Sequence, residues 1–398
     1  MIFEIILAIL LGILFGTFTG LIPGIHTNLI ALIMLSLSAT VLIGLDNLVL
    51  AIFIVAMATT HSFLDFIPSI YLGAPDEDTA LSVLPGHKYL LGGKAHAAVK
   101  LTLLGSASAI FLLTIVLPFF FLIVPLTIDF IERMMAWLLI WISIFLVTDT
   151  KNKTNSVLIF ILAGVLGIGT LGLNMSEPLL PLLTGLFGTS TIIYSIKQNT
   201  VPPKQKVGKL EFKKKELIKP LITTMIVSPI CSFLPGLGSS QAAIIGSKLS
   251  KKISEDQFLI LLGSINTLVI STSFFTLYLI GKSRTGAASA ISELITITPQ
   301  NLLFISLAMI IAASISIPLT IQLSKKIAKN LHRINYDKTS KVILLLLVAI
   351  TFAISGFLGI FVLMVSTCLG LLCTLIGARK SLLMGCLLIP TILFYFPF

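Results

Sequence analysis

The amino-acid sequence predicts an all-α polytopic membrane protein built from two inverted-topology repeats, each with a re-entrant Pro-Gly hairpin and a broken transmembrane helix. Three observations lead to this fold class. Of the 398 residues, 56% are hydrophobic and 11% are charged, whereas a soluble domain carries about 25% charged residues. Two similar Pro-Gly strings interrupt apolar segments in the same way. Equivalent loops of the two halves carry opposite patterns of basic residues.

The composition excludes several classes of protein. The formal net charge is +11, but the lysines and arginines lie in short loops between apolar runs, which indicates membrane topology and not a nucleic-acid partner. No nucleotide-binding P-loop, HExxH string or nucleophile elbow is present. The four cysteines lie singly in apolar segments, so they do not have the spacing of metal ligands. We therefore expect neither an enzyme nor a bound cofactor.

Each half divides into eight apolar elements, many of them long enough to cross a membrane. The first repeat, 1–196, has its elements at 2–22, 25–44, 47–73, 79–91, 95–128, 134–148, 155–173 and 178–196. The second repeat, 220–398, has its elements at 219–234, 238–250, 257–281, 286–297, 300–324, 341–355, 357–377 and 381–397. Its first element thus begins at the last residue of the linker. A basic linker, 197–219, joins the repeats.

The first two elements of each half surround a Pro-Gly pair. Phe18–Asn28 reads FTGLIPGIHTN and Ile230–Ser240 reads ICSFLPGLGSS. The segment 238–250 is shorter than the ~20 residues that a membrane-spanning helix needs, and it lies between the linker and the basic loop Lys248–Lys252. Both basic segments belong in the cytoplasm. We therefore expect a re-entrant hairpin with its tip at 235–240 and, by symmetry, a second tip at 23–28.

The third and fourth elements of each half contain a second matching pair of strings. Ser69–Leu84 reads SIYLGAPDEDTALSVL and Thr276–Ile291 reads TLYLIGKSRTGAASAI. The loop charges require each pair of elements to cross the membrane once. The pattern predicts one helix in each half, interrupted at Gly73–Asp78 and at Gly281–Thr285.

The loops around the remaining elements set the orientation. The loop after element two has no basic residue in the first half and three lysines in the second, and the loop between elements four and five shows the reverse, with Lys88, Lys94 and Lys100 in the first half. Because positive loops stay in the cytoplasm, equivalent loops lie on opposite sides of the membrane, as in an inverted-topology repeat. The N-terminus is expected outside and the linker in the cytoplasm.

The hairpin tips are the candidate substrate-binding site. Helix N-termini at the tips offer free N–H groups and a positive dipole end to an anion, glycine lets the backbone approach a ligand, and Ser, Thr and Asn occupy N-cap positions. The same residues also fit ordinary caps of a helix–helix turn at the membrane surface, and a hydrogen-bonded structural histidine is the favoured interpretation of the histidine in the first tip. The candidates are Pro23, Gly24, His26, Thr27, Asn28, Pro235, Gly236, Gly238, Ser239 and Ser240.

Charged residues lie in both helix breaks. Asp76, Glu77 and Asp78 could bind Na⁺ or carry a proton, and they also fit first-turn acids at a helix N-terminus. Lys282 and Arg284 could pair with an anionic substrate or with these carboxylates, and they also fit caps at the outer surface. Two further polar features have alternatives of the same kind. His61, like His26, fits a proton carrier or, as the favoured interpretation, a structural histidine, and the stripe Asn266, Thr267, Ser271, Thr272 and Ser273 fits a pathway or interhelical hydrogen bonding. Trp137 and Trp141 fit an interfacial belt.

The two Pro-Gly strings and Tyr71–Ala98, YLGAPDEDTALSVLPGHKYLLGGKAHAA, resemble the TctA family, the large membrane subunit of tripartite tricarboxylate transporters, and in particular its shorter archaeal-type members. The resemblance implies uptake of a di- or tricarboxylate such as citrate, driven by a Na⁺ or proton gradient. In bacterial systems it also implies a small membrane subunit and an extracytoplasmic binding protein. The first tip has His26-Thr27 where the family usually has Gly-Pro.

Two other functional classes and one assembly state stay open at this stage. Polyprenyl-phosphate translocases also use paired re-entrant Pro-Gly hairpins and bind an anionic head group, and a channel or structural membrane protein is a third alternative. A homodimer is compatible with the sequence.

Overall fold

The structure is a computed structural model, and all the regular elements in its described part are helices. It describes residues 2–22, 27–38, 44–73, 78–148, 150, 152–197, 203–208, 210, 215–232, 239–250, 253–281, 285–331 and 336–396.

Most predicted elements appear as helices within a few residues of their expected ends. In the first half the helices are α1 (Ile2–Leu21), α2 (Thr27–Ser38), α3 (Asn47–Leu64), α4 (Phe66–Leu72), η1 (Ala80–Ser82), α5 (Val83–Leu91), α6 (Ala95–Thr148), α7 (Lys153–Leu171), α8 (Leu179–Leu183), η2 (Thr184–Thr189) and α9 (Ser190–Lys197). In the second half they are α10 (Lys215–Ser232), α11 (Ser239–Leu249), α12 (Glu255–Ile280), α13 (Gly286–Leu294), α14 (Pro299–Asn330), α15 (Tyr336–Leu375), η4 (Lys380–Met384) and α16 (Gly385–Tyr395).

Eight helical runs in the described part of the chain are long and apolar enough to cross a membrane. This confirms the prediction of an all-α polytopic, multi-pass membrane protein. Three of these runs differ from the rest in burial. In an 18-residue apolar window of each run, 89% of the residues are buried in the run through α3 and α4, 94% in α12 and 72% in the run through α8, η2 and α9, compared with 28–39% in the others. The helices α3 and α12 are therefore the core, and the less buried spans present their outer faces to lipid.

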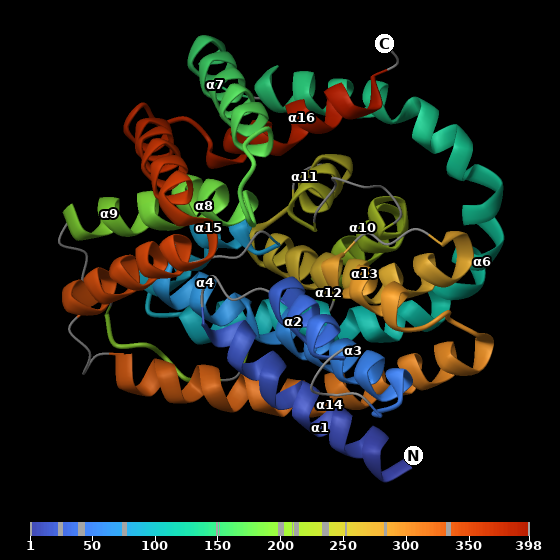
Figure 1. Cartoon of the computed structure of the whole chain (residues 1–398). Helices are drawn as coiled ribbons and strands as arrows, with labels where there is room; N and C mark the ends of the chain where they lie inside the picture. Colours follow the sequence, from blue (N-terminus) through green and yellow to red (C-terminus); the bar gives the residue numbers. More distant parts are fainter. Residues whose placement is uncertain are drawn as a thin grey trace.

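Figure 1 shows how the outer helices surround this core. The helices α1 and α14 lie along one side of α3, and α6 curves around one end of the molecule. On the opposite side from α14, α7 packs against α16, while α15 contacts α8, η2 and α9. Helices α10, α11 and α13 cover α12.

The helix α6 differs from the prediction of two separate elements at 95–128 and 134–148. It is continuous over 54 residues, about 81 Å at 1.5 Å per residue, which exceeds the ~30 Å of a bilayer core. The segment 129–133 contains no glycine or proline, so nothing in its backbone ends the helix there. Instead the helix contains Pro118 and Pro125 and curves, as Figure 1 shows.

Glycines mark the other interruptions. Gly356 divides α15 with non-helical backbone angles, φ 63° and ψ −157°, at the boundary expected between 341–355 and 357–377. Gly73 and Gly281 end α4 and α12 with left-handed φ values of 67° and 65°. A residue without a Cβ adopts this conformation at no steric cost, so each helix stops at the predicted position.

Small residues allow the core helices to approach closely. Gly12, Gly16 and Gly20 lie one turn apart on α1 and face α3, where a Cβ on Gly16 would stand 2.5 Å from the carbonyl oxygen of Met57. At the crossing of α6 and α12, a Cβ on Gly263 would lie 2.0 Å from the Thr102 carbonyl oxygen. Such contacts replace the hydrophobic effect as the force that joins helices in lipid.

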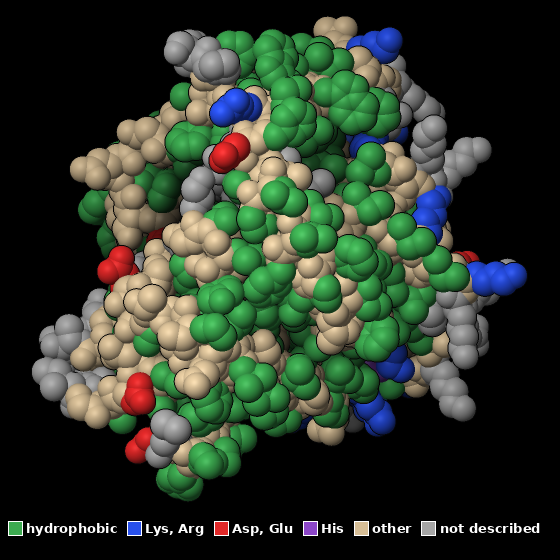
Figure 2. Space-filling view, turned by 90° about the vertical axis from the view of Figure 1, so that its right-hand side faces the viewer, with side chains coloured by type: hydrophobic (Ala, Val, Ile, Leu, Met, Phe, Trp, Pro, Cys, Tyr) green, Lys and Arg blue, Asp and Glu red, His purple; other side chains and the backbone are tan. Residues whose placement is uncertain are grey.

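The outer surface has the pattern of a membrane protein. Figure 2 shows a wide face in which hydrophobic side chains cover the middle, whereas the Lys and Arg side chains lie mainly along one margin and the top and the Asp and Glu side chains mainly at the opposite margin. A belt of this kind faces the hydrocarbon core of a bilayer.

The close helix contacts give a test of the core packing. We expect Gly263→Ala to lower the melting temperature of the purified protein clearly, because overpacking costs about 1–3 kcal/mol and the added methyl group would meet backbone. Gly169→Ala, on α7, is the matched control, since its Cβ would meet nothing within 4 Å and alanine is the better helix former. Equal melting temperatures for the two variants, measured by differential scanning fluorimetry in detergent, would contradict this packing.

Candidate functional site

The described helices begin just after each Pro-Gly string. The helix α2 begins at Thr27 and α11 at Ser239, so Thr27, Asn28, Ser239 and Ser240 lie in first turns, as the sequence predicts. Ten candidates lie outside the described residues: Pro23, Gly24, His26, Asp76, Glu77, Pro235, Gly236, Gly238, Lys282 and Arg284. The candidates that the structure describes are Thr27, Asn28, Asp78, Ser239 and Ser240.

The start of α11 lies against the helix break of the first half. The backbone N–H of Ser239 donates to Oδ1 of Asp78 at 3.0 Å, and Oγ of Ser240 donates to the carbonyl oxygen of Asp78 at 3.1 Å. A carboxylate at this position stabilises the positive end of the α11 dipole. Asp78, expected to bind an ion or to cap its own helix, thus caps a helix 161 residues away in sequence, and its role toward an ion stays a prediction.

The start of α2 lies against the helix break of the second half. Oδ1 of Asn28 accepts a hydrogen bond from the backbone N–H of Ala287 at 3.3 Å, so it caps α13. The approach is close, since a Cβ on Gly286 would stand 2.7 Å from the Asn28 side chain. Each helix that follows a Pro-Gly string thus contacts the helix break of the other half.

The Ser239 side chain adds an unused polar group at this position. Ser239 is 2% exposed, and its Oγ has no hydrogen-bond partner among the residues that the structure describes. Buried hydroxyls are normally satisfied. The start of α11 therefore combines a helix N-terminus, which favours an anion, with a hydroxyl that can donate to one.

A second polar cluster joins α3 to α12 in the core. Nδ2 of Asn266 donates to Oδ2 of Asp65 at 2.7 Å, and the hydroxyls of Ser62 and Thr267 are 3.3 Å apart. Asp65 is 1% exposed and Asn266 is fully buried. The Oδ1 atom of Asn266 has no hydrogen-bond partner within the described part of the chain. The cluster therefore presents oxygen atoms of a kind that bind Na⁺ or a proton.

Asp65 is not among the residues that the sequence patterns pointed to. A usable signal was present, because an ionisable residue inside a transmembrane segment is a functional candidate by default and Asp65 lies within the apolar run 47–73. Its partner Asn266 belongs to the polar stripe, but no feature of one sequence shows that the two residues meet.

The polar stripe of α12 mainly makes interhelical and intrahelical hydrogen bonds. Thr272 contacts the hydroxyl of Ser232 on α10, whereas Ser271 and Ser273 donate to carbonyl oxygens one turn earlier on α12. His61 is buried and its Nδ1 lies 3.0 Å from Oγ1 of Thr19. This contact fits the expected structural histidine.

Three further contacts connect the halves near the ends of the core helices. Nδ2 of Asn47, at the start of α3, donates to the carbonyl oxygen of Leu294 at the end of α13, at 3.0 Å. At the start of α12, Glu255 forms a 2.5 Å ion pair with Lys88 of α5, and the hydroxyl of Tyr89 donates to Asp256. Burial, together with the neighbouring carboxylates, raises the pKa of Tyr89 far above its ordinary value, so the phenol stays protonated and can donate this bond.

Comparisons with known proteins give the family. The chain is 30% identical over 403 residues to an uncharacterised protein of Methanocaldococcus jannaschii, with 98% of each chain covered. No solved structure matches it. A sequence model of the tripartite tricarboxylate transporter TctA family matches residues 6–385, nearly the whole chain. The chain therefore belongs to the tripartite tricarboxylate transporter TctA family and is a transporter component, not an enzyme.

Proposed function

We propose that the protein is a secondary active transporter that takes up a small organic anion, a di- or tricarboxylate such as citrate, coupled to an ion gradient. The family supplies the substrate class. The observation that carries the proposal is the contact of each post-Pro-Gly helix with the helix break of the other half, through Ser239–Asp78 and Asn28–Ala287. The substrate is held between the two tips near the membrane midplane.

The reciprocal contacts support an inverted repeat with a boundary at the 197–219 linker. The tip of each half meets the break of the other. The helix α6 packs on α12, while the equivalent α14 packs on α3, where Ser316 donates to Thr60 at 3.1 Å. In the same way α7 pairs with α16, and α15 pairs with η2. An approximate two-fold axis in the membrane plane relates contacts of this kind. The N-terminus is then outside and the linker is cytoplasmic.

The substrate's carboxylates compete with a carboxylate of the protein. Asp78 occupies the Ser239 N–H, the kind of donor that a substrate carboxylate would take. Substrate binding at the second tip then displaces Asp78 from α11, and the Ser239 hydroxyl supplies a further donor. Lys282 and Arg284 add positive charge in the second break.

The coupling ion binds at acidic residues of the first half. Asp76, Glu77 and Asp78 lie in the break, and Asp65 lies one segment earlier, where α3 crosses α12. A carboxylate buried at this depth is stable only when a proton, a cation or hydrogen bonds compensate its charge. Binding of Na⁺ or H⁺ at Asp65 and Asn266 would link the ion gradient to the relative position of the two core helices.

The TctA protein is the large subunit of a tripartite system. A small membrane subunit and an extracytoplasmic binding protein are the partners that the family implies. The binding protein would deliver substrate to the outer face, where the second half carries few basic residues.

Cysteine labelling tests the proposed orientation. In a variant without the four native cysteines, we expect Lys206→Cys and Lys326→Cys to react with an impermeant maleimide only from the cytoplasmic side, and Asp129→Cys only from outside. All three positions are exposed, so access depends on the side of the membrane alone. Labelling of Asp129→Cys and Lys206→Cys from the same side would rule out the inverted repeat.

Uptake into proteoliposomes tests the tips. We expect Ser239→Ala and Thr27→Ala to raise the KM for labelled citrate or succinate about tenfold, about 1.4 kcal/mol for one lost hydrogen bond. Lys282→Met and Arg284→Met should cost under about 1 kcal/mol if they are exposed caps and about 2–5 kcal/mol if they pair with substrate in a dry pocket. We expect the tip variants to be the more damaging.

A matched control separates binding from folding in this experiment. Ser228→Ala removes a buried hydroxyl on α10 whose Oγ also has no partner among the described residues, and Ser228 precedes the Pro-Gly pair in sequence and is not one of the predicted tip residues. Unchanged uptake in Ser239→Ala and Thr27→Ala, at unchanged protein level, would refute the site. Translocation of a polyprenyl phosphate in place of any acid would favour the lipid-carrier alternative.

The ion site has its own test. We expect Asp65→Asn to abolish uptake driven by an imposed Na⁺ or proton gradient while counterflow exchange of substrate, which needs no net ion movement, persists. Asp46→Asn is the control, because it makes the same change at the exposed start of the same helix and asparagine caps a helix equally well. Gradient-driven uptake by Asp65→Asn at the wild-type rate would exclude Asp65 from coupling.

A further inference from the structure

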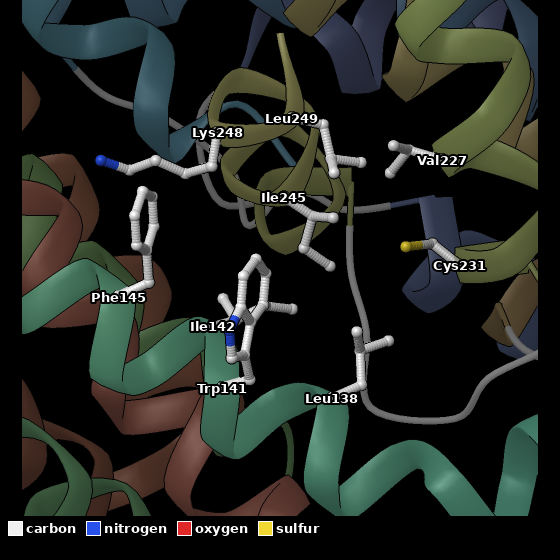
Figure 3. A pocket seen from close by; sticks show the side chains of 9 residues that line it. All are labelled: Leu138, Trp141, Ile142, Phe145, Val227, Cys231, Ile245, Lys248 and Leu249. Atoms are coloured by element: carbon white, nitrogen blue, oxygen red, sulfur yellow. The ribbon is translucent and has the colours of Figure 1, made fainter. Parts of the chain in front are cut away.

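An apolar pocket lies between the distal part of α6 and the helix pair α10–α11 (Figure 3). Its volume is about 110 Å³. Trp141, Ile142 and Phe145 form the α6 wall, Val227 and Cys231 come from α10, and Ile245 points into the gap from α11. Apolar cavities of about this size, ~150 Å³ in one engineered case, stay dry and take up hydrocarbon. The pocket therefore suits a hydrocarbon chain.

Positive charge lies at one edge of this pocket. Lys248, in the last turn of α11, lines the pocket and places its ammonium group 5.1 Å from the centre of the Phe145 ring. A second, more open hollow of about 580 Å³ adjoins the first, because Leu249 lines both. Lys215 and Lys219 of α10 line this second hollow. Three lysines thus surround the base of the α10–α11 pair, and the lining of the two hollows, as far as the described residues show it, contains no Asp or Glu.

The spacing of these features fits one leaflet of a membrane. Along an α-helix, Lys219 and Cys231 are separated by about 18 Å, and half of a bilayer's hydrocarbon core is about 15 Å thick. On the outer face of α10 between these levels, Ile222 and Ile226 are exposed. A molecule with its charged group at the lysines would therefore reach the apolar pocket with its chain.

We propose that the groove formed by the two hollows, from Lys215, Lys219 and Lys248 to the apolar pocket at Trp141 and Cys231, binds one anionic phospholipid. The phosphate lies among the three lysines and one hydrocarbon chain enters the pocket. Lysine clusters at the cytoplasmic ends of membrane helices attract anionic lipids in this way. A zwitterionic lipid would fill the pocket equally well but would gain less from the lysines. The groove would thus select anionic over zwitterionic phospholipids by the charge of the head group.

This site lies apart from the proposed transport site, and it contacts the helix pair that leads to the second tip. Lipid between α10–α11 and α6 fills the space into which that pair could move. The bound lipid would thereby favour one position of the second tip. This effect on the tip rests on the proposed function, whereas the binding of lipid does not.

The two tryptophans of the chain allow the binding to be measured directly. Trp137 and Trp141 are the only tryptophans in the sequence, and only Trp141 lines the pocket. In a Trp137→Phe variant reconstituted in mixed bilayers, quenching of Trp141 by phosphatidylglycerol or phosphatidylcholine with brominated chains reports which lipid occupies the pocket. We expect the anionic lipid to bind at least about fivefold more tightly, the gain for one lysine near the surface.

Three further variants make the result decisive. Lys215→Gln/Lys219→Gln/Lys248→Gln should reduce this preference to near unity, whereas Lys153→Gln, an exposed lysine at the start of α7, should leave it unchanged. A Trp141→Phe variant, which reports from Trp137, should show no preference. Equal quenching by both lipids in Trp137→Phe, or an unchanged preference after loss of the three lysines, would overturn the proposal. Failure of every brominated lipid to quench Trp141 would mean that a protein partner covers the groove, and would also overturn it.

Discussion

Hydrocarbon offers no hydrogen-bond partner to the end of a helix, and this constraint determines how the middle of the molecule is built. The chain has helix ends beside both Pro-Gly strings and at both helix breaks, and each needs partners from protein. The described contacts supply two of them from the first half: Asp78 accepts from Ser239 at the start of α11, and Asn28 accepts from Ala287 at the start of α13. The first half therefore completes two helix ends of the second half, which could not bury them alone.

The same constraint explains why polar side chains join the core helices although most of their residues are apolar. The core helices α3 and α12 are the most buried of the spans, yet they meet through Asp65, Asn266 and Thr267. Side-chain hydrogen bonds and close backbone contacts at Gly105 and Gly263 hold helices together where burial from water contributes little. A core joined in this way can exchange one set of hydrogen bonds for another without exposing apolar surface to water.

Much of the helical layout could be predicted because its signals are local. Apolar runs of membrane length, Gly73, Gly281 and Gly356 each mark an element or its end within a short window. The one merged element, α6, shows the limit: charged residues at 129–133 indicate a loop only if a backbone breaker accompanies them. Contacts between distant segments were not predictable in this way. Asp78 carries the same sequence signal whether it caps its own helix or α11, and nothing near Asp65 specifies Asn266.

The two post-Pro-Gly helices each pack on the long core helix of their own half, α2 on α3 and α11 on α12, but they differ in charge, and this difference follows from orientation. No lysine or arginine precedes Lys88, so the first helix pair, α1 and α2, has no cation that could hold a lipid phosphate. The α10–α11 pair has Lys215, Lys219 and Lys248 at its base. In the proposed topology this base faces the cytoplasm, where anionic lipids concentrate. The charges that orient the second half would then also recruit a lipid beside its tip, whereas the first tip would work without one. The two halves of the substrate site would therefore differ in mobility as well as in their hydrogen bonds, because Ser239 donates to Asp78 whereas Asn28 accepts from Ala287.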